Sequence, residues 1–298
     1  MEKFRKRKRL FRSMFSSYDM DRESPLFDND PLIGKDDSHS LFLNRYSEEE
    51  MRGILSRVGL LRHLENMGFD NLILDIFCDE SLIHYLRIFS RNKDPKRLLV
   101  DLRLSENRFI PSDVKVPFKN AAFDIFFVEW LQSQNPLKRE FSAERPQLPG
   151  QQRPGLGCLK YVMAMMNEVS DEVIRDGFLD IPDHFHLGVM YTRSFRFFDP
   201  AKEGEMRALL RDLRDYSLSD ITWGVMTGSV LEKKSGKPYE YVPSEEIFPL
   251  SPRMRSYFNN KTYEKLMKDN LRKHYVIDMK KTAERKAEIL SKSKMVDL

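Results

Sequence analysis

The sequence predicts a mixed α/β fold (α+β): a mostly antiparallel central sheet with one parallel strand–helix–strand unit, helices on both faces and a C-terminal helical extension. Three observations predict it. Short strand-like segments follow one another at 71–77, 82–90 and 97–104, and short loops between consecutive strands favour antiparallel pairing. The segment 123–134 is apolar on both faces, which is typical of a strand in the middle of a sheet. A glycine-rich loop, an amphipathic helix and a further short strand then follow.

The composition supports a folded protein with a substantial core. The chain has 298 residues, of which 41% are hydrophobic and 32% charged, with 21 phenylalanines, and such a chain can bury an aromatic interior. We expect a basic, partly extended arm over 1–45, a core over 46–215, and a mostly helical extension over 216–298 that packs on the core.

Charge and cysteine usage indicate the surroundings of the protein. Basic residues gather at the two ends of the chain while the middle is acidic; basic termini can make weak contact with nucleic acid or an anionic membrane, and a solvated tail is the other interpretation. No apolar run is long enough for a transmembrane segment, and no apolar stretch follows the charged N-terminus as in a secretory signal. With only the distant Cys78 and Cys158, we predict a cytoplasmic protein.

The first ordered segment is expected to be a helix. Ser47 followed by Glu50 forms a capping box, and Met51, Leu55, Val58 and Leu61 continue at helical spacing until Gly68. The three strand-like segments come next in the chain.

Pro136 ends the central strand and a Pro/Gly-rich loop follows. We expect a helix from Leu159, a strand over 177–181, and a helix from Asp183, its N-cap, to about Phe195. The later segments predict, in order, a helix over 204–213, an ambiguous segment over 219–231 for which helix is favoured, an extended segment over 239–250, and one or two basic helices over 252–291.

The segment Gln151–Lys160 carries the most specific signal. Its glycines allow a ligand to approach the backbone, and the first amides and the dipole of the following helix favour an anion. A pyrophosphate suits such a turn. The segment matches neither the phosphate-binding P-loop nor the dinucleotide-binding glycine pattern.

The pattern Gln152-x-x-Gly155-x-Gly157 resembles the Gln/Arg-x-x-Gly-x-Gly/Ala signature of the GNAT-type acyl-CoA N-acyltransferases, with a strand before it and a helix after it. The segment 181–197, which includes Tyr191, resembles the later strand and helix of that family. The likeness covers about 47–200. The sequence departs from the family in the long spacer 136–150, in Asp183-His184 where Asn is common, and in residues 201–298, which match nothing in it.

The resemblance implies an acyl-CoA-dependent N-acyltransferase that moves an acetyl or other acyl group from CoA to an unidentified amine by direct transfer. Its partners would be a CoA thioester and the amine acceptor, with acetyl-CoA or another acyl-CoA as substrate and no metal. The implied contacts to CoA come from the strand and the glycine turn, namely Trp130, Leu131, Gln132, Gln152, Arg153, Gly155, Leu156, Gly157 and Cys158.

Direct transfer needs a base for the amine and an acid for the departing thiolate. Glu129, inside an apolar strand, is the candidate base, because removal from water would raise its proton affinity; alternatively it pairs with Arg or Lys, or points to a cleft edge without reacting. Tyr191 is the acid that the resemblance implies, and the alternative is a core tyrosine whose hydroxyl is satisfied. His184 and His186 form a pair without a visible third ligand, which disfavours a metal site.

A second function of another class stays open. The same fold could be a non-catalytic CoA-binding module, or could bind an anionic surface such as nucleic acid or a membrane through its basic ends. An enzyme is the favoured prediction.

Overall fold

The computed structural model describes residues 41–298 except 112–114, 118–121, 144 and 171–173. Except for Asp297, these residues belong to one compact unit. Most of the predicted N-terminal arm, up to residue 40, lies outside the described residues. The elements of the described part, in chain order, are α2 (Glu48–Arg57), α3 (Leu60–Asn66), β1 (Leu72–Cys78), β2 (Ile83–Ser90), η1 (Pro95–Arg97), β3 (Leu98–Phe109), β4 (Phe123–Ser133), α4 (Leu159–Ser170), β5 (Gly177–Asp180), α5 (Phe185–Tyr191), β6 (Arg196–Phe197), α6 (Pro200–Asp212), α7 (Leu218–Met226), β7 (Val230–Glu232), β8 (Glu246–Pro249), α8 (Pro252–Phe258), α9 (Lys261–Leu271), β9 (Tyr275–Ile277), α10 (Met279–Lys292) and η2 (Met295–Asp297).

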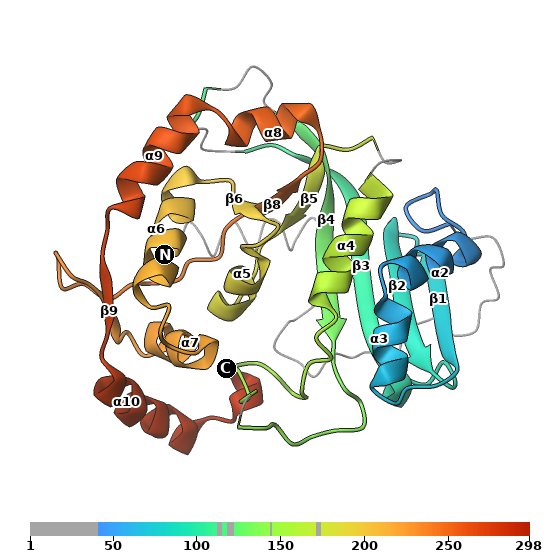
Figure 1. Cartoon of the computed structure of the whole chain (residues 1–298), viewed down its shortest axis with the longest axis horizontal. Helices are drawn as coiled ribbons and strands as arrows, with labels where there is room; N and C mark the ends of the chain where they lie inside the picture. The colour runs from blue at the N-terminus through green and yellow to red at the C-terminus, as the bar shows by residue number, and fades with distance from the viewer. Residues whose placement is uncertain (1–40, 112–114, 118–121, 144, 171–173) are drawn as a thin grey trace. The chain divides into compact units, whose positions relative to one another are not determined.

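A seven-stranded sheet with the order β1-β2-β3-β4-β5-β8-β6 organises the described chain (Figure 1). Among its described pairs, β4 and β5 run parallel and the others antiparallel. The predicted mixed, mostly antiparallel sheet with one parallel unit is therefore confirmed. β4 is the fourth of the seven strands, as its two apolar faces predict.

A β-bulge interrupts β4 at Glu129. Leu104 of β3 pairs with Val128 of β4, whereas the preceding Arg103 pairs with Trp130, so Glu129 has no partner in the register. A bulge reverses which face the following side chains occupy. Val128 and Leu131 accordingly pack against the same core cluster although their numbers differ in parity.

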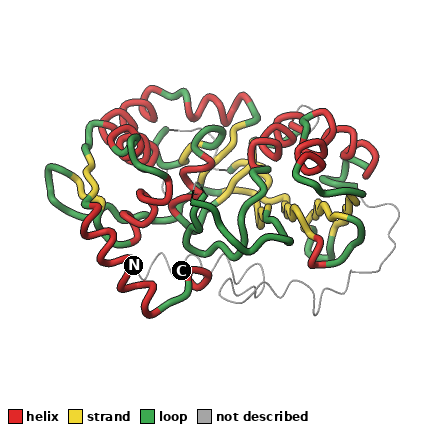
Figure 2. The backbone as a smooth tube through the Cα atoms, turned by 60° about the horizontal axis from the view of Figure 1, so that its bottom comes forward, coloured by secondary structure: helices red, strands yellow, loops and turns green. Residues whose placement is uncertain are grey.

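Helices cover both faces of the sheet, as predicted. On one face α2, α3 and α4 pack against β1 to β4 through a core that includes Leu55, Met166 and Phe126. On the other face α8 and α9 supply Tyr257 and Tyr263, which pack among the buried aromatics of the strands. Figure 2 shows helices packed around the central strands.

The predicted first helix is two helices. Its capping box is confirmed, because the Ser47 side chain accepts from the Glu50 amide and the Glu50 side chain accepts from the Ser47 amide. The prediction of one helix to Gly68 was wrong, because Gly59, with φ +83°, breaks it into α2 and α3. A left-handed residue ends a helix, and glycine adopts that conformation without strain.

The helix after β5 is shorter than predicted. It begins at Phe185 with His184, not Asp183, as N-cap, and it ends at Tyr191. The residues that follow form the short strand β6, which pairs with β8. Pairing of Arg196 with Ile247, about fifty residues away, ends the helical course, and local periodicity cannot show such a contact.

The C-terminal third contains more elements than the sequence indicates. Segment 219–231 is helix α7 followed by strand β7, which pairs with β9 in a second, two-stranded sheet. Segment 239–250 is strand only over β8, and 252–291 holds three helices and a strand, not one or two helices.

Two helical glycines make a matched test of the packing of α6 on α9. A Cβ at Gly204 would overlap the Met267 carbonyl oxygen and lie 2.8 Å from Cβ of Asn270. We expect Gly204→Ala to lower the free energy of unfolding by about 2 kcal/mol through overpacking. Gly53→Ala, whose Cβ meets only the Arg57 guanidinium at 3.4 Å, should instead raise it by about 0.5 kcal/mol. Urea unfolding measures both, and equal effects would contradict the packing.

Candidate functional site

The candidate site lies where β4 and β5 diverge. The two strands pair over three positions, from Ile125 opposite Gly177 to Phe127 opposite Leu179. On the edge of β4 that faces away from β3, the next contacts are made by the glycine turn, since Leu156 donates to the Ser133 carbonyl and Asn135 donates to the Pro154 carbonyl. The edge between them, residues 128–132, spans about 16 Å.

Asp176 fixes the closed end of the strand pair. Its amide donates to the Asp124 carbonyl at 2.7 Å, and its carboxylate accepts from the Asp124 amide at 2.9 Å. Ser251 and Arg253 also donate to this carboxylate. Burial acts to raise the pKa of Asp176, but these hydrogen bonds outweigh burial and hold the pKa below its ordinary value. The strands are therefore held together at one end only.

The predicted glycine turn lies at the other end, at the start of α4. Gly155 and Gly157 are exposed, and Gly157 has φ +69°. The Leu156 side chain is buried and its amide donates to Ser133, so this amide is already used within the protein. The amides of Gly157 and Cys158 make no hydrogen bond to the described residues.

The side chains of the turn have different roles. Arg153 donates to the Pro136 carbonyl at 2.7 Å and so joins the two ends of the long loop, whereas Gln152 is exposed. Cys158 is buried, and burial raises the pKa of its thiol, which agrees with a small packing residue and not with a thiolate. His63 of α3 supports the turn with Nε2 at 2.8 Å from the Leu156 carbonyl oxygen.

Three predicted contacts, Trp130, Leu131 and Gln132, lie on the unpaired edge of β4. Leu131 packs on the core. The indole Nε1 of Trp130 and the Oε1 of Gln132 are buried and have no hydrogen-bond partner among the described residues. Buried polar atoms of this kind are uncommon in folded proteins and call for a partner.

The long spacer before the turn reaches α5. Gly150, with φ +77°, lies so close to His184 that a Cβ there would be 2.9 Å from Nε2 of the imidazole. The Gly150 amide donates to the carbonyl of Met295 at 2.9 Å. The spacer therefore connects the start of α5, the end of the chain and the glycine turn.

Glu129 projects from the bulge and keeps contact with solvent. Ser105 donates a short hydrogen bond to its carboxylate, so the partner that the described residues provide is a hydroxyl, where the alternative interpretation expected Arg or Lys. Displacement of water by the surrounding protein raises the pKa of Glu129, and the bond from Ser105 opposes that rise. The carboxylate is thus exposed enough to meet a ligand and more basic than an ordinary glutamate.

Tyr191, at the end of α5, is 6% exposed and packs against Phe195 with ring centroids 5.1 Å apart. Burial first, and then the carboxylate of Asp180 against its hydroxyl, raise the pKa of Tyr191 well above its ordinary value. The hydroxyl therefore keeps its proton near neutral pH.

The structure adds two carboxyl groups that the sequence prediction did not include. Asp180, the last residue of β5, pairs across the sheet with Glu246, the first of β8. Asp180 as a whole residue is partly exposed, but protein surrounds its carboxyl group, and this burial raises the pKa of the carboxyl group to about 6. Glu246 is 0% exposed, and burial followed by the charge of Asp180 raises its pKa to about 9. In the sequence, the one sign that Asp180 could belong to the site was that an acidic residue ends an apolar strand.

His184 and His186 stack with ring centroids 5.3 Å apart. His186 is buried, and burial lowers its pKa to about 4, so it is neutral. Within the described ranges, no group of three or more His, Cys, Asp or Glu side chains is arranged to hold a metal ion.

The described helices also include none long and apolar enough to cross a bilayer.

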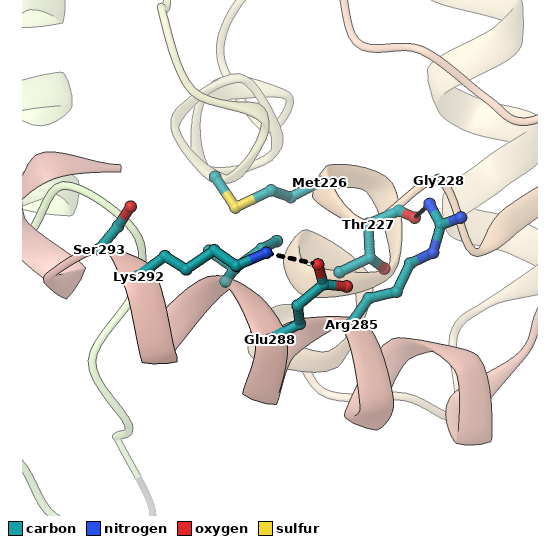
Figure 3. Close-up of a pocket in the computed structure, with 8 residues that line it drawn as sticks. Met226, Thr227, Gly228, Arg285, Glu288, Lys292 and Ser293 are labelled. Atoms are coloured by element: carbon teal, nitrogen blue, oxygen red, sulfur yellow. Dashed lines mark hydrogen bonds and ion pairs between the residues drawn. The ribbon is translucent and has the colours of Figure 1, made fainter.

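A separate pocket of about 520 Å³ lies between the end of α7 and α10 (Figure 3). Its charged side chains are already engaged, since Arg285 donates to the Thr227 carbonyl and Lys292 pairs with Glu288. These contacts attach α10 to the C-terminal end of α7, where positive charges interact favourably with the helix dipole.

Comparison of the chain with protein-family models, with curated proteins and with solved structures gave no match in any of the three. The functional argument therefore depends on the geometry of the strand divergence and on the residues gathered there.

The Ser105–Glu129 contact gives a prediction about the site itself. In Ser105→Ala the carboxylate loses the hydrogen bond that favours its charged form, so the pKa of Glu129 should rise above that of the wild type. Side-chain NMR titration measures it, with the signal assigned through Glu129→Gln. Ser291→Ala, an exposed serine of α10, is the control and should leave the titration unchanged. A pKa that stays the same in Ser105→Ala would contradict the contact.

Proposed function

We propose that the protein is an acyl-CoA-dependent N-acyltransferase of the GNAT type, which transfers an acetyl or other acyl group directly from CoA to an amine. The observation that carries the proposal is the divergence of β4 from β5 beside a glycine turn, with Glu129 on the diverging edge and Tyr191 interacting with Asp180 at the end of β5. The sheet order, with its single described parallel pair, supports it. We place the reaction in the cytoplasm, where CoA thioesters are available.

In this proposal the diphosphate of CoA lies on the turn that begins α4. The amides of Gly157 and Cys158, which make no hydrogen bond to the residues that the structure describes, provide partial positive charge there together with the helix dipole. The pantetheine arm runs along residues 128–132 and pairs with backbone groups as an added strand does. This edge is unpaired with β5 and leads from the turn towards Glu129 and Asp180.

The chemistry follows from the protonation states. Glu129, whose pKa is raised, takes a proton from the acceptor ammonium, and the neutral amine attacks the thioester carbonyl. The C–N bond forms and the C–S bond breaks. The nitrogen loses its second proton to solvent, and Tyr191 gives its proton to the departing thiolate. Because Tyr191 keeps its proton at neutral pH, it enters this step in the required form.

The alternative function, attachment to an anionic surface, is less well supported. The basic N-terminal segment lies outside the described residues. In α10, Lys281 and Arg285 donate to carbonyls at the end of α7, and Lys286 lies over the Trp223 ring, 4.8 Å from its centroid. These cations serve internal packing, and charge alone is a weak argument for a binding surface.

CoA binding is the first test. Acetyl-CoA or CoA at about 100 times its dissociation constant should stabilise the fold by about 2.7 kcal/mol and raise the melting temperature by about 5 °C. Gly155→Leu should abolish this shift, because the new side chain would occupy the exposed turn while its Cβ meets only the Ser133 carbonyl oxygen, at 3.6 Å. Gly53→Leu on α2 is the control and should keep the shift. If wild-type protein shows no shift with any acyl-CoA, the proposal is wrong.

Turnover tests the two ionisable side chains. Thiol release from acetyl-CoA should be measured with a panel of amines, since the acceptor class is open. Tyr191→Phe and Glu129→Gln should each lower kcat by about 100-fold, because each removes one proton transfer. Binding of CoA should persist in both variants, which separates lost chemistry from lost folding. Unchanged turnover in both would leave a CoA-binding protein without these catalytic groups.

A further inference from the structure

Two buried polar atoms on β4 have no role in the proposed chemistry, although they belong to side chains of the candidate site. The indole Nε1 of Trp130 and the Oε1 of Gln132 make no hydrogen bond to any described residue. In the proposed function the pantetheine arm pairs with backbone groups of this edge and leaves both side chains unused. Each atom gives up hydrogen bonds to water when it is buried, so each calls for a partner.

Trp130 and Gln132 lie on one face of the sheet. Their cross-strand partners on β3 are Arg103 and Asp101, two residues apart, and cross-strand partners share a face. The guanidinium carbon of Arg103 lies 6.0 Å from the centroid of the Trp130 ring, which agrees with this placement. Leu131, between the two side chains, packs into the core on the other face. Trp130 and Gln132 can therefore contact the same ligand.

Glu129 reaches this face as well. Ser105, which donates to the Glu129 carboxylate, follows Arg103 by two residues on β3, so its side chain points to the face that carries Trp130. Glu129 is exposed, and Trp130 and Gln132 are partly exposed as whole residues. A ligand that approaches from solvent would therefore meet the carboxylate, the indole and the amide in that order along β4.

The charged groups beside these side chains bind one another. Asp101 is buried and accepts from Arg103 at 2.7 Å and from Arg87 at 3.4 Å. What Trp130 and Gln132 themselves offer to a ligand is one neutral donor and one neutral acceptor. Such a pair suits an uncharged polar group, whereas phosphate and carboxylate groups are recognised through charged donors.

The hydrogen-bonding capacity of the two atoms defines that group. An indole Nε1 only donates, so the ligand must present an acceptor to Trp130, and a glutamine Oε1 only accepts, so the ligand must present a donor to Gln132. A peptide carries both, in its carbonyl and its N–H. An extended peptide repeats every two residues, or about 7 Å, and Trp130 and Gln132 are likewise two residues apart on a strand.

We propose that the acceptor of the transfer is the N-terminal α-amine of an extended peptide, bound along β4 by Trp130 and Gln132. The inference rests on the proposed transferase and names the substrate class of the same site. The α-ammonium lies at Glu129, the first carbonyl accepts from Trp130, and a later N–H donates to Gln132. Because Glu129 directly precedes Trp130, the amine and the carbonyl must be close together, as they are in a first residue and not in a lysine side chain. Trp130 and Gln132 thus determine specificity, and neither transfers a proton.

Tryptophan fluorescence tests binding without any turnover. The indole Nε1 is covered although Trp130 keeps contact with solvent, so a peptide must move the ring to reach it. The chain has two tryptophans. Trialanine methyl ester should therefore change the emission of the wild type and of Trp223→Phe, and should leave that of Trp130→Phe unchanged. An equal change in Trp130→Phe, or no change in the wild type with CoA present or absent, would overturn the proposal.

A change in the peptide tests the hydrogen bond to Gln132. An analogue in which ester oxygens replace both peptide N–H groups keeps the amine and the carbonyls but cannot donate. In calorimetry it should bind the wild type about 5-fold more weakly than trialanine methyl ester. Gln132→Met should bind both ligands with this weaker affinity, because the cycle isolates one contact. Gln134→Met, which leaves both atoms in place, is the control and should behave as the wild type. Losses that multiply would contradict the contact.

Steady-state turnover with acetyl-CoA separates specificity from catalysis. Gln132→Met should raise KM for trialanine methyl ester by about 5-fold and leave kcat unchanged, since the contact is the same in the ground state and the transition state. KM for the ester analogue should not change. A lower kcat with an unchanged KM would overturn this role.

The two proposals can fail separately. If the wild type binds the peptide through Trp130 but binds no CoA, the transferase is wrong and the peptide site is retained. If it binds CoA and acylates amines that lack a peptide group as well as it acylates trialanine methyl ester, the transferase is retained and the peptide site is wrong.

Discussion

The short parallel contact between β4 and β5 is the constraint on which the site depends. Asp176 holds the strands together at one end through its amide, its carboxylate and Arg253, and pairing stops after three positions. Beyond that point β5 has β8 as its partner, and β4 has β3. Because each strand is satisfied on its outer side, the two can separate without breaking the sheet. The separation exposes an edge of β4 that a continuous sheet would have covered.

The bulge at Glu129 lies within that edge, and the apolar strand accommodates the carboxylate there because it has a hydroxyl partner and contact with solvent. Glu129 lies on the same face as the buried Phe127, because Ser105, which donates to the Glu129 carboxylate, is the cross-strand partner of Phe127. The extra residue changes the faces that follow. Trp130 lies beside Arg103 of β3, and Leu131 returns to the core that Val128 contacts. The carboxylate therefore lies on β4 beside the divergence, bound by a hydroxyl and open to solvent.

Local signals in the sequence predicted much of the fold, and non-local pairing explains what they missed. The Ser47 capping box, the two-sided strand and the helix after Gly157 depend on neighbouring residues, and each is present. The bulge depends on the register with β3, and the end of α5 depends on β8, far along the chain. For the same reason the sequence indicated Glu129 and Tyr191 but could not bring Asp180 and Glu246 together.

The position of β8 also changes how the C-terminal region relates to the site. Residues 246–249 fall within the segment expected to be an extension packed on the core, yet they pair with β5 inside the central sheet. β8 supplies Glu246, the cross-strand partner of Asp180, and, through Phe248, a ring 6.2 Å from that of Phe178. A strand that completes the sheet and contributes a carboxyl group whose charge acts on Tyr191 belongs to the site as much as β4 does. The C-terminal region is therefore part of the folded unit that carries the candidate site.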